Sequence, residues 1–288
     1  MSDALQQLFA GRELLVATMH EKERCIAPAF LARFPLAGCR AIAGLDTDRF
    51  GAFSGERRRE LDPRATAEAK ARAGAELADA ELVLASEGSF GPHPASPFLS
   101  CDEEWLVLWD RASGTAYAHR HLSAEAICGG TECATWEEVA RCAERFSFPE
   151  HALVLKSRSA WEPGDPIAKD LLERAALEEA ARALLRAHGR LWVEVDLRAH
   201  RNATRRRVIE RAAREFADEL ARLCPRCGEV HDAVARARRG LACADCGEPT
   251  PIVCALVRAC ARCGASSEEP RPDGRTHEDP GACPSCNP

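Results

Sequence analysis

Eight of the fifteen cysteines are arranged as four Cys-x-x-Cys pairs in the last quarter of the chain, and this pattern limits the possible fold more than any other feature. Two residues between the thiolates let one tight turn present both sulfurs to one tetrahedral Zn²⁺, and a glycine after three of the pairs relieves that turn. The sequence therefore predicts a ribbon-like module with two structural zinc sites. The eight predicted ligands are Cys224, Cys227, Cys243, Cys246, Cys260, Cys263, Cys283 and Cys286.

The spacing of the pairs does not decide which of them share an ion. Fifteen residues separate the first pair from the second and nineteen separate the third from the fourth, and both gaps fit a four-cysteine zinc ribbon. Consecutive pairs can share an ion, or the first and third pairs can. A redox function is disfavoured, because redox Cys-x-x-Cys motifs usually open a helix of a thioredoxin-like unit and do not occur four in a row. Metal binding instead indicates a reducing compartment.

Strand-like and helix-like segments alternate before the cysteine pairs. The strand candidates are 14–17, 39–43, 81–85, 152–155 and 191–195, with a hairpin formed by 105–109 and 115–119. The helix candidates are 23–32, 64–77, 135–146, 167–188 and 204–223. The polar, glycine-rich segment 86–94 is expected to be a loop. This order predicts an α/β protein with a mixed sheet and flanking helices.

Three regions follow from this order. Residues 1–156 are predicted to form an α/β domain that binds phosphate and metal. Residues 165–223 are predicted to form a helix–strand–helix connecting region, and residues 224–288 the zinc-ribbon module.

Charge is distributed unevenly along the chain. The formal net charge is −6, yet residues 198–239 carry twelve arginines against six acidic residues. Such a region raises nucleic acid as a partner, although a solvated helix face explains the same arginines. No segment resembles a membrane span and the N-terminus lacks a secretory signal, so we expect a cytoplasmic protein. The sequence does not indicate the oligomeric state.

Taken end to end, the chain resembles an uncharacterised bacterial family that carries a domain of unknown function and a cysteine-rich tail. This resemblance implies no established activity. The matching stretches are 17–22, 46–48, 53–56, 85–94, 102–104 and 283–288.

Residues 12–110 also resemble the house-cleaning nucleoside triphosphate pyrophosphatases, of the inosine and xanthosine triphosphatase type and the Maf type. The shared order is a strand, a threonine-containing turn with a lysine, a helix, a long acidic loop, the helical motif 66–71, and a strand that ends in an acid and a glycine. The resemblance implies that Thr18, Lys22 and Lys70 hold phosphate. It also implies that Glu87 holds a metal ion.

The residues support a phosphate site on physical grounds as well. Backbone amides at a strand-to-helix turn, with a lysine nearby, form a pocket for anions. Carboxylates suit Mg²⁺, which would bridge substrate phosphates while a water attacks phosphorus and a histidine relays the proton. The candidate carboxylates are Glu87, Asp46, Asp48 and Glu56, and the candidate histidines are His20 and His93.

Each of these residues also has a purely structural interpretation. Asp46 and Asp48 can cap a loop, Glu56 can form a surface ion pair with the arginines that follow it, and Lys70 can be a solvated helix residue. The leading hypothesis is a Mg²⁺-dependent phosphohydrolase acting on a nucleotide or related compound. It predicts that Thr18, Lys22, Glu56, Lys70 and Glu87 converge in one cleft. The alternative is a non-enzymatic adaptor that binds nucleic acid or protein, which predicts a continuous arginine face.

Overall fold

The computed structural model divides the chain into two compact units. Residues 8–217 form the α/β unit, and residues 218–288 together with the first seven residues form the cysteine-rich unit. The structure describes residues 2–51, 59–93, 96–125, 127–230, 236–260, 262–271 and 273–288, without the side chains of 93, 96 and 97.

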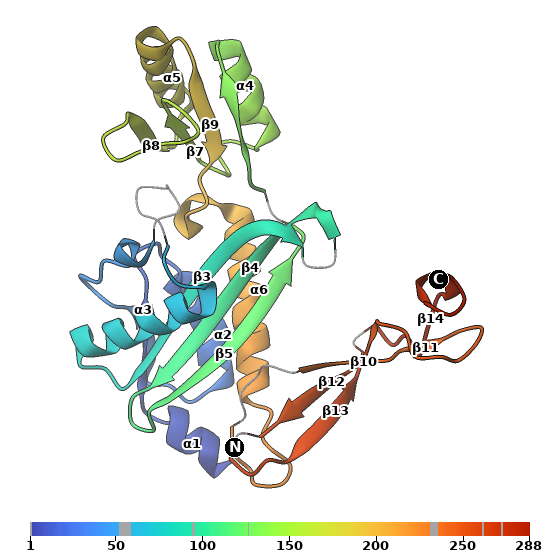
Figure 1. Cartoon of the computed structure of the whole chain (residues 1–288). Helices are drawn as coiled ribbons and strands as arrows, with labels where there is room; N and C mark the ends of the chain where they lie inside the picture. The colour runs from blue at the N-terminus through green and yellow to red at the C-terminus, as the bar shows by residue number, and fades with distance from the viewer. Residues whose placement is uncertain are drawn as a thin grey trace. The chain divides into compact units, whose positions relative to one another are not determined.

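The first sheet of the α/β unit has five strands and mixed direction (Figure 1). The strand β1 runs parallel to both of its neighbours, whereas β4 runs antiparallel to both β3 and β5. In spatial order the strands are β2 (Gly38–Ala41), β1 (Glu13–Ala17), β3 (Leu82–His93), β4 (Ser96–Asp110) and β5 (Thr115–Ser123).

Helices cover both faces of this sheet (Figure 1). On one face lie α2 (Glu23–Arg33) and α6 (Ala203–Leu220), whose Phe30 and Phe216 rings meet edge to face at 5.9 Å. On the other lies α3 (Pro63–Ala78), which buries a row of alanines against the sheet. Asp62 begins α3, because its carboxylate accepts the backbone N–H of Ala65 over 2.9 Å. A short helix, α1 (Asp3–Phe9), precedes β1.

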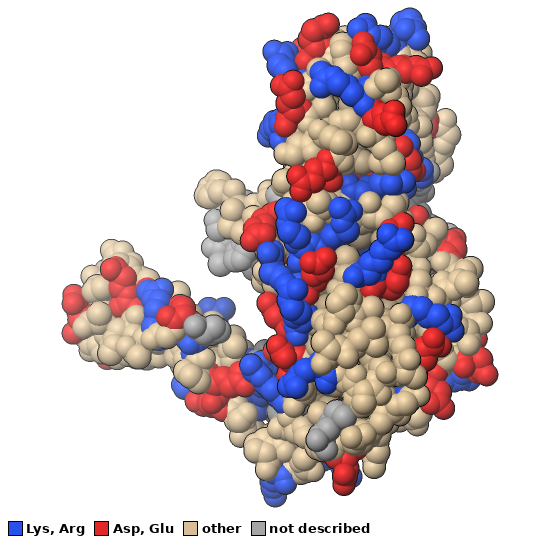
Figure 2. All heavy atoms as spheres, turned by 180° about the vertical axis from the view of Figure 1, so that it is seen from behind, with Lys and Arg blue, Asp and Glu red and all other residues tan. Residues whose placement is uncertain are grey.

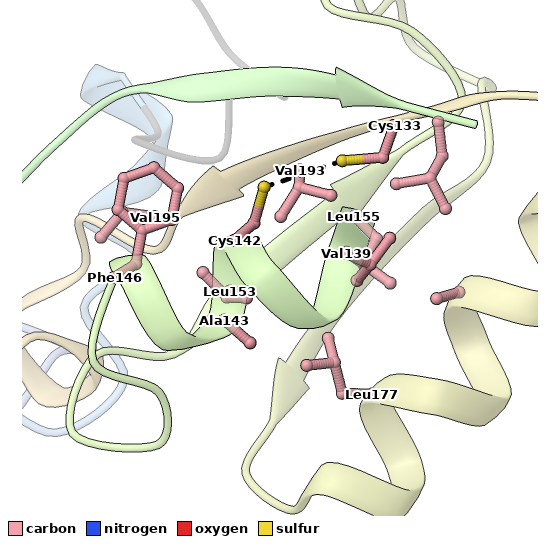
Figure 3. Close-up of a cluster of buried hydrophobic side chains, with 12 residues drawn as sticks. Cys133, Val139, Cys142, Ala143, Phe146, Leu153, Leu155, Leu177, Val193 and Val195 are labelled. Carbon is pink, nitrogen blue, oxygen red and sulfur yellow. Dashed lines mark hydrogen bonds between the residues drawn. The ribbon is translucent and has the colours of Figure 1, made fainter. Parts of the chain in front are cut away.

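A second sheet of four strands has its own apolar core (Figure 3). Leu153, Leu155 and Val193 of the sheet are fully buried beneath Val139 and Leu177 of two helices. In spatial order the strands are β6 (Gly130–Cys133), β9 (Leu191–Val195), β7 (Leu153–Lys156) and β8 (Ile167–Leu171), and the helices are α4 (Trp136–Arg145) and α5 (Arg174–His188). Strands β6 and β7 of this sheet come from residues up to position 156, and strands β8 and β9 come from residues after it.

The cysteine-rich unit contains two small sheets. One is antiparallel, in the order β10 (Arg236–Arg239), β12 (Val253–Ala259) and β13 (Ser266–Pro270). The other pairs β11 (Ala242–Cys243) with β14 (His277–Glu278) in parallel. Arg258 is buried in this unit, with ion pairs to Glu219 at 2.8 Å and to Glu269 at 3.1 Å.

The mixed α/β class predicted from the sequence is confirmed, with two local corrections. Residues 167–171 are the strand β8 rather than the start of a helix, because β7 pairs with them and Asp170 has a positive φ of 63°. The segment 86–94, expected to be a loop, continues β3 as far as His93. Pairing with β4 satisfies its backbone and overrides the low strand propensity of glycine and proline.

Candidate functional site

Each cysteine cluster draws its sulfurs from two pairs that are not neighbours in the sequence. The first and third pairs form one tetrad, and the second and fourth pairs form the other. Within each tetrad all four sulfurs lie within 4.8 Å of one another. The pairing left open by the spacing is therefore interleaved. The tetrads are Cys224, Cys227, Cys260 and Cys263, and Cys243, Cys246, Cys283 and Cys286.

The distances between sulfurs fit a tetrahedral metal ion. Cys224 Sγ lies 3.6 Å from Cys263 Sγ, and Cys227 Sγ lies 3.6 Å from Cys260 Sγ. The corresponding distances in the second tetrad are 3.8 Å and 3.7 Å. Four sulfurs held about 2.3 Å from Zn²⁺ stand roughly 3.8 Å apart at tetrahedral angles. Both clusters are thus suited to a structural metal of the type that thiolates bind, such as zinc.

The same backbone turn recurs at all four pairs. In each, the residue after the second cysteine donates its N–H to the carbonyl of the first, over 2.8 to 3.1 Å. Three of these donors, Gly228, Gly247 and Gly264, have positive φ angles between 68° and 73°. Glycine enters this left-handed region without steric cost. The role predicted for these glycines is confirmed.

Backbone amides also prepare one thiol of each tetrad for metal binding. The amide of Cys227 is the main reason that the pKa of the Cys224 thiol is lowered to about 6. The amide of Cys286 similarly lowers the pKa of the Cys283 thiol to about 7. Because the thiolate is the form that binds metal, Cys224 and Cys283 favour the ligand state at neutral pH, whereas the neighbouring thiols raise the pKa of Cys286 to about 12.

A second candidate site is a small cavity in the α/β unit, beside the carboxyl end of β1. Its volume is about 10 Å³, roughly the space of one water molecule. Six of the residues predicted from the sequence line it, together with Arg205 and Ser86, and we name it the charged cavity. The six are Thr18, His20, Lys22, Asp48, Lys70 and Glu87.

Glu87 is held between two cations in this cavity. Lys70 Nζ lies 2.6 Å from its Oε2, and Arg59 Nη1 lies 3.2 Å from its Oε1. Burial raises the pKa of Glu87, but Lys70 and Lys22 outweigh that effect and the pKa is lowered. Lys70 is 6% exposed. It is therefore a buried ion-pair partner rather than a solvated helix residue.

Lys22 reaches the same cavity from the start of α2. Its Nζ donates to the backbone oxygen of Ser86 at 3.1 Å and to the Ser86 hydroxyl at 2.9 Å. Burial lowers the pKa of Lys22 to about 8. The hydroxyl of Thr18 accepts the backbone N–H groups of His20 at 3.0 Å and of Lys22 at 3.4 Å. Thr18 thus shapes the turn that presents Lys22.

Arg205 and Glu104 form a buried ion pair that the sequence did not reveal. Arg205 Nε lies 2.6 Å from Glu104 Oε1, and the two side chains are 1% and 0% exposed. Gly88 leaves room for the pair, because a β-carbon there would lie 2.6 Å from Glu104 Oε1. Asp102, on the same face of β4, has its pKa raised to about 7 by burial and by Glu104. Asp102 and Glu104 share one face of β4 with the buried Leu106 and Leu108, and this spacing of two was the available signal of burial.

His20 is neutral in this setting. Burial and then Lys22 lower its pKa to about 3. Its ring stacks on that of His200, with centroids 5.0 Å apart, and its Nε2 lies 3.9 Å from Asp48 Oδ1. Burial also raises the pKa of Asp48. His20 and Asp48 therefore place a neutral imidazole next to a half-buried carboxyl group.

Three predicted residues are not placed in the charged cavity. Asp46 is exposed, and its carboxylate accepts the backbone N–H groups of Asp48 and Arg49, so it caps a loop. Glu56 lies outside the described residues. The backbone of His93 ends β3, and its side chain also lies outside the description.

The carboxylates of the charged cavity do not form a ready magnesium site. Mg²⁺ takes oxygen ligands in a near-octahedral shell, whereas both oxygens of Glu87 are engaged by Lys70 and Arg59. Among the described residues, no group of three His, Cys, Asp or Glu ligand atoms gathers around this cavity. The residues present do not fit a preformed Mg²⁺ site.

A comparison with protein-family models identifies the family of this chain. The model of a domain of unknown function, DUF6671, matches residues 70–288. The chain belongs to the DUF6671 family. The stretch that matches DUF6671 contains Lys70, Glu87 and all eight cysteines of the tetrads, whereas Thr18 and Lys22 precede it. No curated protein matches the chain.

The arginines of this DUF6671 protein do not form an uninterrupted basic face in the part of 198–239 that is described. Arg207 and Arg211 reach Glu150 and Glu125. Arg198 is paired with Asp170 and Asp196. Figure 2 shows Lys and Arg interspersed with Asp and Glu on the face it presents.

None of the described helices has both the length and the apolar composition that crossing a bilayer requires.

Proposed function

We propose that the charged cavity binds the phosphate of a nucleotide or related compound and supports its hydrolysis. The observation that carries this proposal is the convergence of Thr18, Lys22, Lys70 and Glu87, which are far apart in the sequence, on one buried cavity. Thr18 and Lys22 come from the turn after β1, Lys70 from α3 and Glu87 from β3.

The balance of charge in the cavity favours an anion. Lys22, Lys70 and Arg205 are all less than 9% exposed, and Glu87 and Glu104 are their buried carboxylate partners. The lining of the cavity itself holds these three cations against the two carboxyl groups of Glu87 and Asp48, and burial raises the pKa of Asp48. A bound phosphate would accept charge-assisted hydrogen bonds from cations of this lining, which would stabilise the bound state.

The chemistry expected of these residues is proton transfer and charge neutralisation. A water attacks phosphorus, its proton passes to neutral His20, and the bond to the leaving oxygen breaks. Burial is the main cause of the low pKa of His20 and the charge of Lys22 is the second; a phosphate next to Lys22 would offset the second cause and make the imidazole a better base. Lys70 would exchange its hydrogen bond to Glu87 for one to the phosphate, because both groups accept hydrogen bonds from an ammonium ion.

A cavity of about 10 Å³ is too small for a nucleotide, so binding requires the surrounding loops to open. The expected dependence on Mg²⁺ stays a prediction. The ion would arrive with the substrate phosphates, which supply the oxygen ligands that the protein lacks.

In the cysteine-rich unit we propose that the metal is zinc and that its role is structural. Each tetrad provides four thiolates, which closes the coordination shell and leaves no position for a substrate.

A hydrolysis screen with nucleotides and phosphoesters, with and without Mg²⁺, tests the enzymatic proposal. We expect activity in the wild type and a loss of about 100-fold or more in Lys22→Met and in Glu87→Gln, because each removes a charged group from the cavity. The control variants are Arg72→Met, on the helix that carries Lys70, and Glu81→Gln, next to the strand that carries Glu87, because both residues have exposed side chains.

Equal inactivity of all variants and the wild type would overturn the enzymatic proposal. Salt-dependent binding of nucleic acid in the same preparations would then favour the adaptor alternative.

A further inference from the structure

Two histidines and a glutamate meet on the opposite face of the first sheet from α3. His119 and His121 are two residues apart on β5, so their side chains share one face of the sheet. Glu215 of α6 reaches both: its Oε2 lies 3.2 Å from His119 Nε2 and 2.8 Å from His121 Nδ1. The three atoms that can bind a metal lie within 4.8 Å of one another.

The surrounding structure holds this cluster in place. The His119 side chain is 8% exposed, and its ring stacks on Phe216 with centroids 5.7 Å apart. One helical turn before Glu215, Arg211 donates to the hydroxyl of Ser123 at 3.3 Å. Arg211 and Glu215 are one helical turn apart, and their partners Ser123 and His121 are two strand residues apart, which is a similar distance. The two contacts together therefore set the position of α6 along β5. The cluster is therefore part of a fixed helix–sheet contact.

We propose that His119, His121 and Glu215 form a third metal site, which binds a divalent first-row transition metal such as Zn²⁺. Imidazole and carboxylate ligands suit these metals, whereas Mg²⁺ and Ca²⁺ require a shell of oxygen atoms. Both histidines contact the same carboxylate oxygen, Oε2 of Glu215. A metal ion bound by the three atoms would take the place of the protons in these two hydrogen bonds.

Three protein ligands leave a coordination position open. Structural zinc sites are closed by four protein ligands, whereas sites with three keep a place for water or substrate. Glu215 is 49% exposed, so water reaches this position. The proposed site thus differs in kind from both cysteine tetrads, and it does not depend on the phosphate-binding proposal.

Titration of Co²⁺ into the full-length protein, with its cysteine tetrads already loaded with zinc, tests this site. We expect one further equivalent to bind, with weak visible absorption and without the charge-transfer bands of cobalt thiolates. Because His119 is buried, the variants are His121→Ala and Glu215→Gln. Each should weaken Co²⁺ binding by at least about 10-fold, the smallest effect usual for residues that support a metal site.

Two matched variants serve as controls. Glu210→Gln changes a glutamate on the same helix, and His188→Ala changes an exposed histidine of α5. Both should bind Co²⁺ as the wild type does, and circular dichroism of all four variants checks their folding. The proposal is overturned if no Co²⁺ binds beyond the cysteine sites, or if folded Glu215→Gln binds it as tightly as Glu210→Gln.

Discussion

The cysteine-rich unit and the α/β unit solve the same problem, that of holding polar groups in a fixed place, by different means. In the cysteine-rich unit the strand β10 is exposed along its whole length, and the sulfur tetrads take the place of a large apolar core. In the α/β unit, strands such as β7 are fully buried, and cations and carboxylates are paired inside. If the tetrads hold zinc as we propose, one unit depends on a ligand from outside, whereas the other depends on contacts within the chain.

The largest effect that distinguishes the two units is expected from metal removal. A strong chelator should unfold the cysteine-rich unit, because structural zinc contributes on the order of 10 kcal/mol or more to the folding of small modules. The α/β unit should stay folded, with its apolar core intact. Hydrogen exchange of the full-length protein, with and without chelator, measures both units at once. Equal loss of protection in both units would contradict the comparison.

A smaller effect is expected from the buried ion pair of the α/β unit. Arg205→Met leaves Glu104 buried without its cation, and we expect a loss of about 3–5 kcal/mol in the free energy of unfolding. Arg40→Met removes an exposed pair with Glu13 and should change stability far less. Urea denaturation gives both values. If the two variants unfold at the same urea concentration, the buried pair is not important for stability.

The smallest effect is the dependence of stability on pH that His20 confers. Its pKa is about 3 in the folded protein and about 6.5 when unfolded, so the unfolded chain binds the proton first as pH falls. Its contribution to stability is full above pH 6.5 and is lost as pH falls toward 3. Between pH 7 and pH 5 the loss is about 2 kcal/mol.

Comparison of the wild type with His20→Gln isolates the contribution of His20, because the contributions of the other titrating groups are the same in both proteins and cancel in the difference. As pH is lowered from 7 to 5, the free energy of unfolding should fall less in the variant than in the wild type. A difference that does not change with pH would show that His20 titrates normally.

The sequence predicted the two units unequally well, and the reason is physical. A Cys-x-x-Cys turn is made by neighbouring residues, so its ligands and glycines are visible in the sequence. The ion pair of Arg205 and Glu104 joins residues 101 positions apart, and no local pattern marks Arg205 among the other arginines of α6. Thr18, Lys22, Lys70 and Glu87 were identified through a resemblance and the order of elements, and their roles stay a prediction.

Sequence spacing also could not decide how the cysteine pairs combine. The gaps of fifteen and nineteen residues separate consecutive pairs, whereas 32 and 36 residues separate the pairs that combine in the structure. The interleaved arrangement appears only when β12 brings Cys260, next to its end, to the pair that begins with Cys224. Long-range strand pairing therefore selects between two assignments that local chemistry permits equally.

The most direct test of the account is the zinc content of two double variants of the full-length protein, each made in a His121→Ala background so that only zinc in the cysteine tetrads is counted. Cys224→Ser/Cys260→Ser damages one tetrad if pairing is interleaved, and about one zinc per chain should remain. Cys224→Ser/Cys243→Ser damages both tetrads, and zinc should fall close to zero. The reverse result, with zinc kept in the second variant and lost in the first, would show that consecutive pairs share an ion and would contradict the structure.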